Sequence, residues 1–320
     1  MARNQGRVGE NKSEIVAALP RACTEEAAAV EFLEQQRWGD SPTCPHCKGT
    51  DVYKMLARDG QRNKLFRWRC RECKQQYTVK VGTVMEDSPI PVRHWNYALW
   101  RACTSKKGVA ALEIKRQCGL SYKSALFMMH RINFAMARYP DKKMSGIIEV
   151  DEAYVGGVPR KFAGNAPLKR GRGTTKTPVV AVIQRDGDIR VRALTRVTAR
   201  NLRDTLLESV DPKGSKLMTD DFYMYRKIGK LFGAGHESVT HSAGEYSHGD
   251  AHCNTCESFF ALLKRSLHGI HHAVSKKHLH RYLAAAEFRF AGRKLEDGER
   301  VVAAIKGAEG KRLFYRVPAA

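Results

Sequence analysis

The sequence is short of acidic side chains and has no long apolar run. Asp and Glu number 33 against 56 Lys and Arg, so the formal net charge is +23. A protein this basic gains affinity for polyanions, because each Lys or Arg that contacts a phosphate releases condensed counterions from the nucleic acid. The charge favours DNA or RNA as the partner, although a basic soluble protein without such a partner has the same composition.

No stretch of about 18 consecutive apolar residues is present, which excludes a membrane-spanning helix and a membrane partner. The chain starts with the polar stretch MARNQGRVGENKSEI, so we expect no secretory signal. The sequence has 9 cysteines, an odd number. In a reducing compartment we expect these to be thiols or metal ligands rather than disulfides.

Four of the cysteines form two Cys-x-x-Cys pairs, CPHC at Cys44–Cys47 and CREC at Cys70–Cys73. Together they supply the four thiolates of a closed, tetrahedral and structural zinc site. The residues between and after the pairs alternate like strands around an Asp59-Gly60 turn. We therefore predict a zinc ribbon rather than four unrelated buried cysteines, with His46 as a solvent-facing spacer.

Residues 91–137 have a helical pattern. Trp95 lies on the apolar face of the first helix, and two further helices flank a turn at Gly119. This order of helix, short turn and helix is typical of a helix-turn-helix. The second helix of that motif enters the DNA major groove with its first residues, here Tyr122 and Lys123. An ordinary helical hairpin has the same order of elements. The neighbouring ribbon and the net charge favour DNA binding.

The pattern after residue 141 predicts strand, strand, strand, helix, strand, helix, strand, helix. The second and third strands form a hairpin with Asp186-Gly187 as its turn. Antiparallel strands that flank a parallel core in this order predict a ribonuclease-H-like α/β sheet. A basic Gly- and Pro-rich stretch, residues 158–178, has no acid and is predicted to bind phosphates without sequence preference. Its expected DNA contacts are Arg160, Lys161, Lys169, Arg170 and Arg172.

Three carboxylates are predicted to converge in this domain. Asp151 and Asp220 each end a strand, and Glu257 begins a helix that packs across the strands. A single Asp at a strand end commonly caps a turn. Three carboxylates from separate elements instead suit two hard cations about 3.5–4 Å apart, which clamp the attacking and leaving oxygens of a phosphoryl transfer.

The stretch HCNTCESFFALLKR, His252–Arg265, allows three interpretations. As a helix it places Glu257 and Lys264 two turns apart on one polar face. Its apolar stripe is formed by Phe259, Phe260, Leu263 and Leu267. A second zinc knuckle would use Cys253 and Cys256 with His248 or His252, but it has no second cysteine pair. A helix that merely packs explains the apolar stripe and leaves the polar face unexplained.

The stretches VDEAYVGG, LMTDDFYMY, HCNTCESFFALLKRSLHGIHHAVSKKHLHRYL and AAEFRF resemble bacterial insertion-sequence transposases. These have an N-terminal zinc ribbon and an Asp-Asp-Glu catalytic domain, and the resemblance spans roughly residues 32–294. It implies that Asp151, Asp220 and Glu257 bind two Mg²⁺ or Mn²⁺ ions, with Asp220 chosen over Asp221. It also implies a role for Lys264, and we expect the adjacent Arg265 to bind DNA.

The resemblance implies a DNA transposase that cuts the ends of a mobile element and joins the freed 3′ hydroxyl to target DNA. Its partners would be double-stranded terminal inverted repeats and target DNA, bound by a homodimer or higher oligomer in a prokaryotic cytoplasm, near the nucleoid. Two alternatives stay open. A DNA-binding regulator would need no carboxylate triad, and a structure-specific nuclease would cut without joining.

We therefore expect a multidomain chain with one structural Zn²⁺. Its predicted parts are a flexible N-terminus (1–30), a zinc ribbon (31–90), a helix-turn-helix segment (91–140), a ribonuclease-H-like transposase domain (141–294) and a C-terminal tail (295–320). Five histidines have no assigned role, namely His268, His271, His272, His278 and His280.

Overall fold

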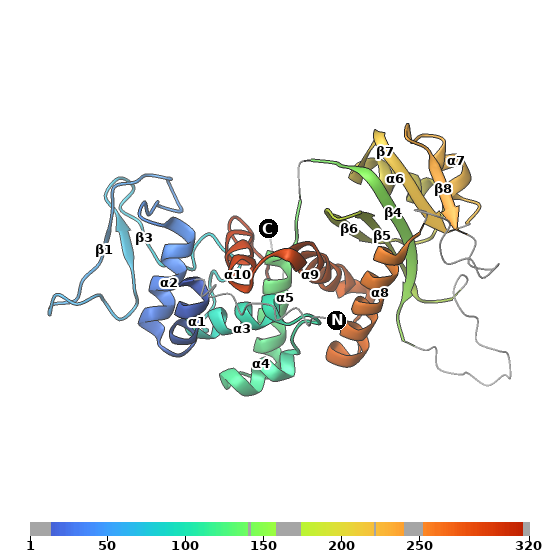
Figure 1. The fold of residues 1–320 in the computed structure, drawn as a ribbon. Coiled ribbons are helices and arrows are strands. Elements are labelled where there is room, and N and C mark those ends of the chain that lie inside the picture. Colours follow the sequence, from blue (N-terminus) through green and yellow to red (C-terminus); the bar gives the residue numbers. More distant parts are fainter. Residues whose placement is uncertain (1–13, 140–141, 158–173, 221, 240–251, 316–320) are drawn as a thin grey trace, which may run out of the picture. The chain divides into compact units, whose positions relative to one another are not determined.

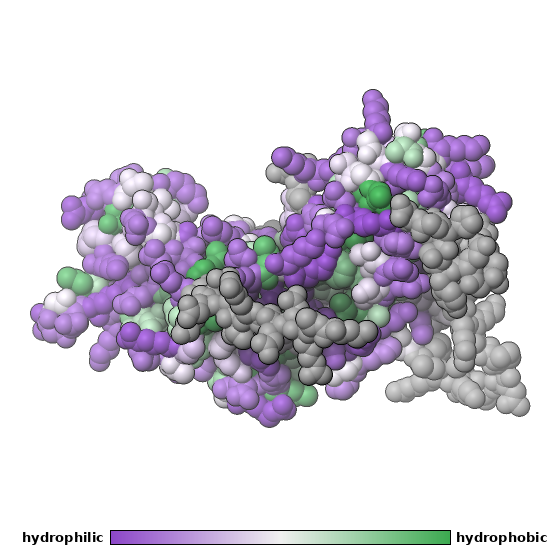
Figure 2. Space-filling model, in the orientation of Figure 1, coloured by the Kyte–Doolittle hydropathy of each residue, from purple (hydrophilic) through white to green (hydrophobic). Residues whose placement is uncertain are grey.

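The computed structural model describes residues 14–139, 142–157, 174–220, 222–239 and 252–315 (Figure 1). They form two compact units. One draws its residues from Met1–Thr104, Cys118–Ala135 and Leu295–Ala320, and the other from Ser105–Gln117 and Met136–Lys294. Most of the described surface in Figure 2 is hydrophilic, as the high charged content requires. No described helix is long and apolar enough to cross a membrane.

The first unit combines a helical bundle with a small antiparallel sheet of order β1-β2-β3. The strands are β1 (Val52–Lys54), β2 (Trp68–Cys70) and β3 (Gln76–Tyr77). The helices are α1 (Glu14–Thr24), α2 (Glu26–Trp38), α3 (Val92–Thr104), α5 (Tyr122–Ala135) and α10 (Asp297–Lys306). Trp95 on α3 is 1% exposed, as its place on the predicted apolar face requires.

The ends of the chain differ from the prediction. The segment expected to be a flexible N-terminus contains α1 and the start of α2, and the expected tail contains α10. Apolar residues of these helices, such as Leu19 and Ile305, are buried. Helix α10 packs against α3 and α2, so residues far apart in the sequence share one core. Short helices such as these are stabilised mainly by tertiary packing of their apolar faces, which short stretches of sequence do not reveal.

The second unit is built on a five-stranded sheet of order β6-β5-β4-β7-β8. Its strands are β4 (Met144–Val155), β5 (Thr177–Gln184), β6 (Ile189–Ala193), β7 (Val210–Asp220) and β8 (His236–Val239). Its helices are α4 (Ala111–Cys118, ending at the unit boundary), α6 (Ala199–Ser209), α7 (Tyr225–Gly229), α8 (Asn254–Ser266) and α9 (Leu279–Ala291). The predicted order of eight elements, from β4 to α8, is confirmed, although α7 is only one turn long.

The sheet is antiparallel on one side of β4 and parallel on the other. Strand β4 pairs antiparallel with β5, and β5 with β6, whereas β7 is parallel to both β4 and β8. The β5–β6 turn lies at Asp186-Gly187 as predicted, and the N–H of Gly187 donates to the carbonyl of Gln184. Because strand residues alternate between faces, two apolar cores form. Helices α8 and α9 cover one face, and α6 and α7 cover the other.

The helices predicted for the helix-turn-helix are present. Helix α4 ends at Cys118, Gly119 has a φ of 64°, and the hydroxyl of Ser121 caps α5 by accepting the N–H of Ser124 at 3.1 Å. Most of α4 belongs to the second unit, however, and α5 to the first. The predicted role of this pair in DNA binding therefore stays a prediction.

Candidate active site and zinc centre

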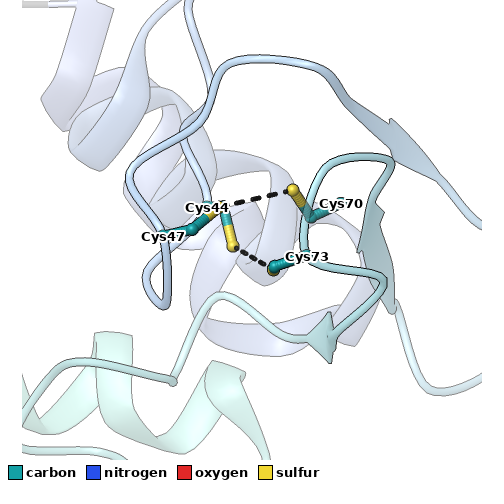
Figure 3. Close-up of side chains that lie close together, drawn as sticks. All are labelled: Cys44, Cys47, Cys70 and Cys73. Carbon is teal, nitrogen blue, oxygen red and sulfur yellow. Dashed lines mark hydrogen bonds between the residues drawn. The ribbon is translucent and has the colours of Figure 1, made fainter.

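The four predicted zinc ligands meet at one point in the ribbon. The Sγ atoms of Cys44 and Cys73 lie 3.6 Å apart, as do those of Cys47 and Cys70 (Figure 3). All four lie within 4.8 Å of one another. A zinc–sulfur bond of about 2.3 Å puts the corners of a tetrahedron about 3.8 Å apart. The cluster therefore fits a structural Zn²⁺ with no open position.

Both cysteine pairs adopt the same backbone turn. The residue after each pair, Lys48 or Lys74, has a positive φ of 64° or 61°. Cys44 also accepts the N–H of Lys48 at 2.9 Å, which closes the first turn. His46 is exposed and its ring meets that of Tyr77 edge-on, so it lies outside the ligand cluster, as predicted.

Asp151 and Asp220 lie side by side on adjacent parallel strands. The register pairs Val150 with Thr219, which makes Asp151 and Asp220 the next residues along β4 and β7. Two-residue periodicity directs both side chains to the sheet face that α8 covers, since Ala153 and Met218 belong to the core on that face. Both aspartates are partly buried.

The position of Asp151 within its strand differs from the prediction. Asp151 was expected at the end of a short strand, but β4 continues to Val155 and pairs Asp151 with Ala181 of β5. Only the pairing with β7 stops at Val150. The physical reason is that a long hairpin with β5 extends β4 beyond its parallel neighbour. The backbone of Asp151 is therefore paired with β5 on one side and is not paired with β7 on the other.

Helix α8 carries Glu257 and Lys264, as predicted. Its apolar stripe is buried at Phe259, Phe260 and Leu263, and Leu267, directly after the helix, is buried too. Glu257 and Lys264 are exposed on the polar face. This division follows from helical periodicity. The helix lies against β4 and β5 (Figure 1), so its first turn borders the aspartates.

Electrostatics link the four residues. Burial raises the pKa of Asp151 to about 6. The N–H of Glu152 donates to Asp151 at 2.7 Å and lowers this pKa. The negative charges of Asp220 and Glu257 raise the pKa further, and the positive charge of Lys264 lowers it. A partly buried carboxylate repelled by two others is stabilised by an added positive charge. The site is therefore suited to cations.

The carboxylates are spread more widely than the zinc ligands. Among the described residues, the four cysteines form the single group of three or more potential metal ligands within 4.8 Å of one another. Ligands that share two ions about 3.5–4 Å apart need not be so close. The spacing argues against one ion held tightly by all three carboxylates.

Two groups next to the carboxylates were missed by the sequence analysis. The Tyr225 hydroxyl donates to Glu152 on the opposite sheet face. Burial, with the charges of Glu152, Asp220 and Asp151, raises the pKa of Tyr225 well above its ordinary value. The second group is Glu149, a fully buried carboxylate two residues before Asp151. Its only sequence signal is a charge within an apolar strand.

The second-knuckle interpretation is not supported by the described residues. Cys253 and Cys256 are 3% and 0% exposed, and their thiols face the carbonyls of Val150 and Ala181 at 3.9 Å. Among the described residues, neither thiol belongs to a group of three or more potential metal ligands. His248 lies outside the described residues.

The predicted DNA contacts divide into two groups. Tyr122, which is 48% exposed, and Lys123 lie in the exposed first turn of α5, and Arg265 is exposed on α8. The contacts predicted on the basic stretch lie outside the described residues; they are Arg160, Lys161, Lys169, Arg170 and Arg172.

The histidine-rich stretch after α8 begins with a π-helical turn, Leu267–His271. His268 and His272 are exposed, and the ring of His271 meets that of Tyr282 at 4.7 Å. Burial lowers the pKa of His278 and of His280. Nothing here assigns them a role.

Known proteins share both parts of this chain. Residues 143–291 match the ISXO2-like transposase domain, and residues 24–76 match the transposase zinc-ribbon domain. A protein of Halobacterium salinarum, described as an uncharacterized protein in transposable element ISH50, is 30% identical over 274 residues, which are 82% of this chain and 90% of that protein. The chain belongs to the ISXO2-like transposases of insertion sequences, which carry an N-terminal zinc ribbon.

Proposed function

We propose that the second unit is a ribonuclease-H-like catalytic domain that cuts the ends of a mobile element and joins the freed 3′ hydroxyl to target DNA. One observation carries this proposal. Asp151 and Asp220 are neighbours on the sheet face covered by the helix that bears Glu257. The strand order, antiparallel from β6 to β4 and parallel beyond, supports the fold.

Asp151, Asp220 and Glu257 would hold two Mg²⁺ or Mn²⁺ ions. Their oxygen donors are the ligands that these hard cations prefer, and the charges of Asp220 and Glu257 add to the burial that raises the pKa of Asp151. Two such ions, when bound, supply activation of the attacking oxygen and stabilisation of the leaving oxygen. The chain's own part is to fix the three carboxylates on two strands and one helix.

Basic residues on α8 would hold the DNA at this site. Lys264 is exposed on the same helix face as Glu257 and can bind a phosphate as a point charge. Arg265 beside it can contact the backbone. We assign recognition of the terminal inverted repeats to the first turn of α5, with Tyr122 and Lys123, together with the ribbon. Cutting two ends in concert requires a dimer or higher oligomer.

Replacing Glu257 by Gln should abolish cutting while DNA binding persists, because the amide removes a metal-binding charge and keeps the side-chain size. The test incubates full-length protein, Mg²⁺ and a plasmid that carries the gene with its native flanks. Cuts at the flank boundaries and joined products are expected with the wild-type protein alone.

The matched control is Glu208→Gln, the same substitution at an exposed position on α6, on the opposite sheet face. It should cut and join like the wild type. Cutting without joining would instead identify a nuclease. Tight binding without cutting by the wild type would contradict the proposed function and favour a DNA-binding regulator.

A further inference from the structure

A buried carboxylate on β4 binds the amino terminus of α8. Glu149 is 0% exposed, and its Oε2 accepts the backbone N–H of Thr255 at 2.9 Å and that of Cys256 at 3.4 Å. Its Oε1 accepts the Thr255 hydroxyl at 3.0 Å. The first N–H groups of a helix have no partner within the helix. The side chain of Cys253, at the cap position, makes no hydrogen bond to the N–H groups of the helix, so Glu149 caps α8 from another element.

This cap joins two of the three elements that carry the proposed catalytic carboxylates, β4 and α8. Glu149 and Asp151 are two residues apart on β4 and therefore project from the same sheet face. Cys256, which Glu149 binds, directly precedes Glu257. A shift of α8 along β4 would break these hydrogen bonds, and it would also change the separation between Asp151 and Glu257.

Burying a charged carboxylate costs free energy, which packing of α8 alone does not require. A fully buried carboxylate needs a partner charge, and Arg185 donates from Nε to Glu149 Oε1 at 3.0 Å. His252 Nδ1 lies 3.5 Å from the same oxygen. A local Ser or Asp at the cap position would satisfy the helix N–H groups without burying a charge. Such a local cap would not fix the helix to the strand.

We propose that Glu149 is a positioning residue of the active site, which sets the place of Glu257 relative to Asp151 and Asp220 by clamping α8 to β4. The proposal rests on the proposed function, since it assumes that these three carboxylates bind the metal ions. Partners that orient metal ligands typically change metal affinity by about 10- to 100-fold when they are replaced. Glu149 should have an effect of that size without touching the metal.

Glu149→Gln tests this in the full-length, zinc-loaded protein. The amide keeps the volume but directs an N–H₂ group toward N–H donors and removes the carboxylate charge that pairs with Arg185, so the clamp is lost. We expect the Mn²⁺ concentration for half-maximal binding, measured from the electron paramagnetic resonance signal of free Mn²⁺, to rise by about 10- to 100-fold. Asp151→Asn gives the baseline for binding outside the site.

Glu287→Gln is the matched control, because Glu287 is also a buried glutamate, 4% exposed, that accepts a backbone N–H, from Val191 of β6 at 2.9 Å. It should leave the Mn²⁺ midpoint unchanged, because Glu287 caps no element of the site. A milder pair at Thr255 separates positioning from folding. Thr255→Val, which loses one hydrogen bond to Glu149, should raise the midpoint, and Thr255→Ser should restore it.

Each outcome decides between the two proposals. A wild-type Mn²⁺ midpoint in Glu149→Gln, with a lowered melting temperature, would show a purely structural role and overturn the positioning role. A raised midpoint in a protein that cuts no DNA would support positioning and contradict the proposed function. Equal Mn²⁺ binding by the wild type and Asp151→Asn would overturn both.

Discussion

Asp151→Asn is expected to stabilise the protein at neutral pH in the absence of Mg²⁺ and to abolish strand cutting. Burial and two neighbouring carboxylates raise the pKa of Asp151 to about 6 in the folded chain, against an ordinary value of 3.8. Ionisation is thus less favourable in the folded state, so the penalty grows between about pH 4 and pH 6 and is constant above that range. The shift corresponds to at most about 3 kcal/mol.

Melting temperatures at about pH 5 and about pH 8, in buffer without added Mg²⁺, measure this effect. The gain from Asn should be larger at the higher pH. Cutting should fall more than 100-fold, roughly, since partners of metal ligands alone contribute about 10- to 100-fold. Asp204→Asn, an exposed position on α6, should change neither quantity appreciably. A lower melting temperature for Asp151→Asn at pH 8 would contradict the assignment of Asp151 to a strained cation site.

The opposite signs of these two effects would distinguish a functional carboxylate from a structural one. A carboxylate that holds the fold together destabilises the protein when it is replaced. A carboxylate that serves metal binding destabilises the metal-free fold. Its replacement therefore raises the stability of the protein and removes its activity.

Periodicity made much of the second unit predictable. Apolar alternation marks β5 and β6, the Asp186-Gly187 turn joins them, and a helical stripe marks α8. These signals are local, so they can be read from short stretches of sequence. The three carboxylates of the proposed site were named from the sequence with the help of the resemblance, although Asp151 lies within β4 rather than at its end.

Features that depend on distant partners were not predictable. Glu149 pairs with Thr255, 106 residues away, and nothing near Glu149 in the sequence indicates that it caps a helix. The length of β4 was missed because the hairpin with β5 extends it beyond its parallel neighbour. Helices α1 and α10 have short apolar stripes, and their burial depends on packing against α3.

The ribbon was predictable for a different reason. Metal coordination demands fixed ligand spacing, and two Cys-x-x-Cys pairs satisfy it without reference to the rest of the chain. The attachment of the ribbon to α2 was not apparent. Buried Glu34 of α2 accepts the Trp68 indole N–H at 2.7 Å and pairs with Arg62, and the Trp38 ring meets Trp68 edge-on at 5.7 Å. The zinc-ribbon match starts at residue 24 and so includes this helix.

Loss of zinc is therefore expected to unfold β1–β3 and to loosen the ribbon end of α2. The ribbon core consists of few apolar residues around Cys44 and Cys70, so the ion supplies most of its stability. Structural zinc binding contributes about 10–16 kcal/mol in small domains of this kind. Cys70→Ser removes a fully buried ligand and should reduce bound zinc from about one ion per chain to none.

Zinc content by mass spectrometry and amide hydrogen exchange over residues 44–77 measure this outcome. Exchange should become fast in the ribbon and stay slow in β4 and β5, which lie in the other compact unit. Cys118→Ser is the control, since Cys118 is a buried cysteine outside the cluster, and it should retain zinc. His46→Ala should retain zinc too, because His46 lies outside the four-sulfur group. Slow exchange in the ribbon of zinc-free Cys70→Ser would show that apolar packing against α2, rather than the metal, holds the ribbon together.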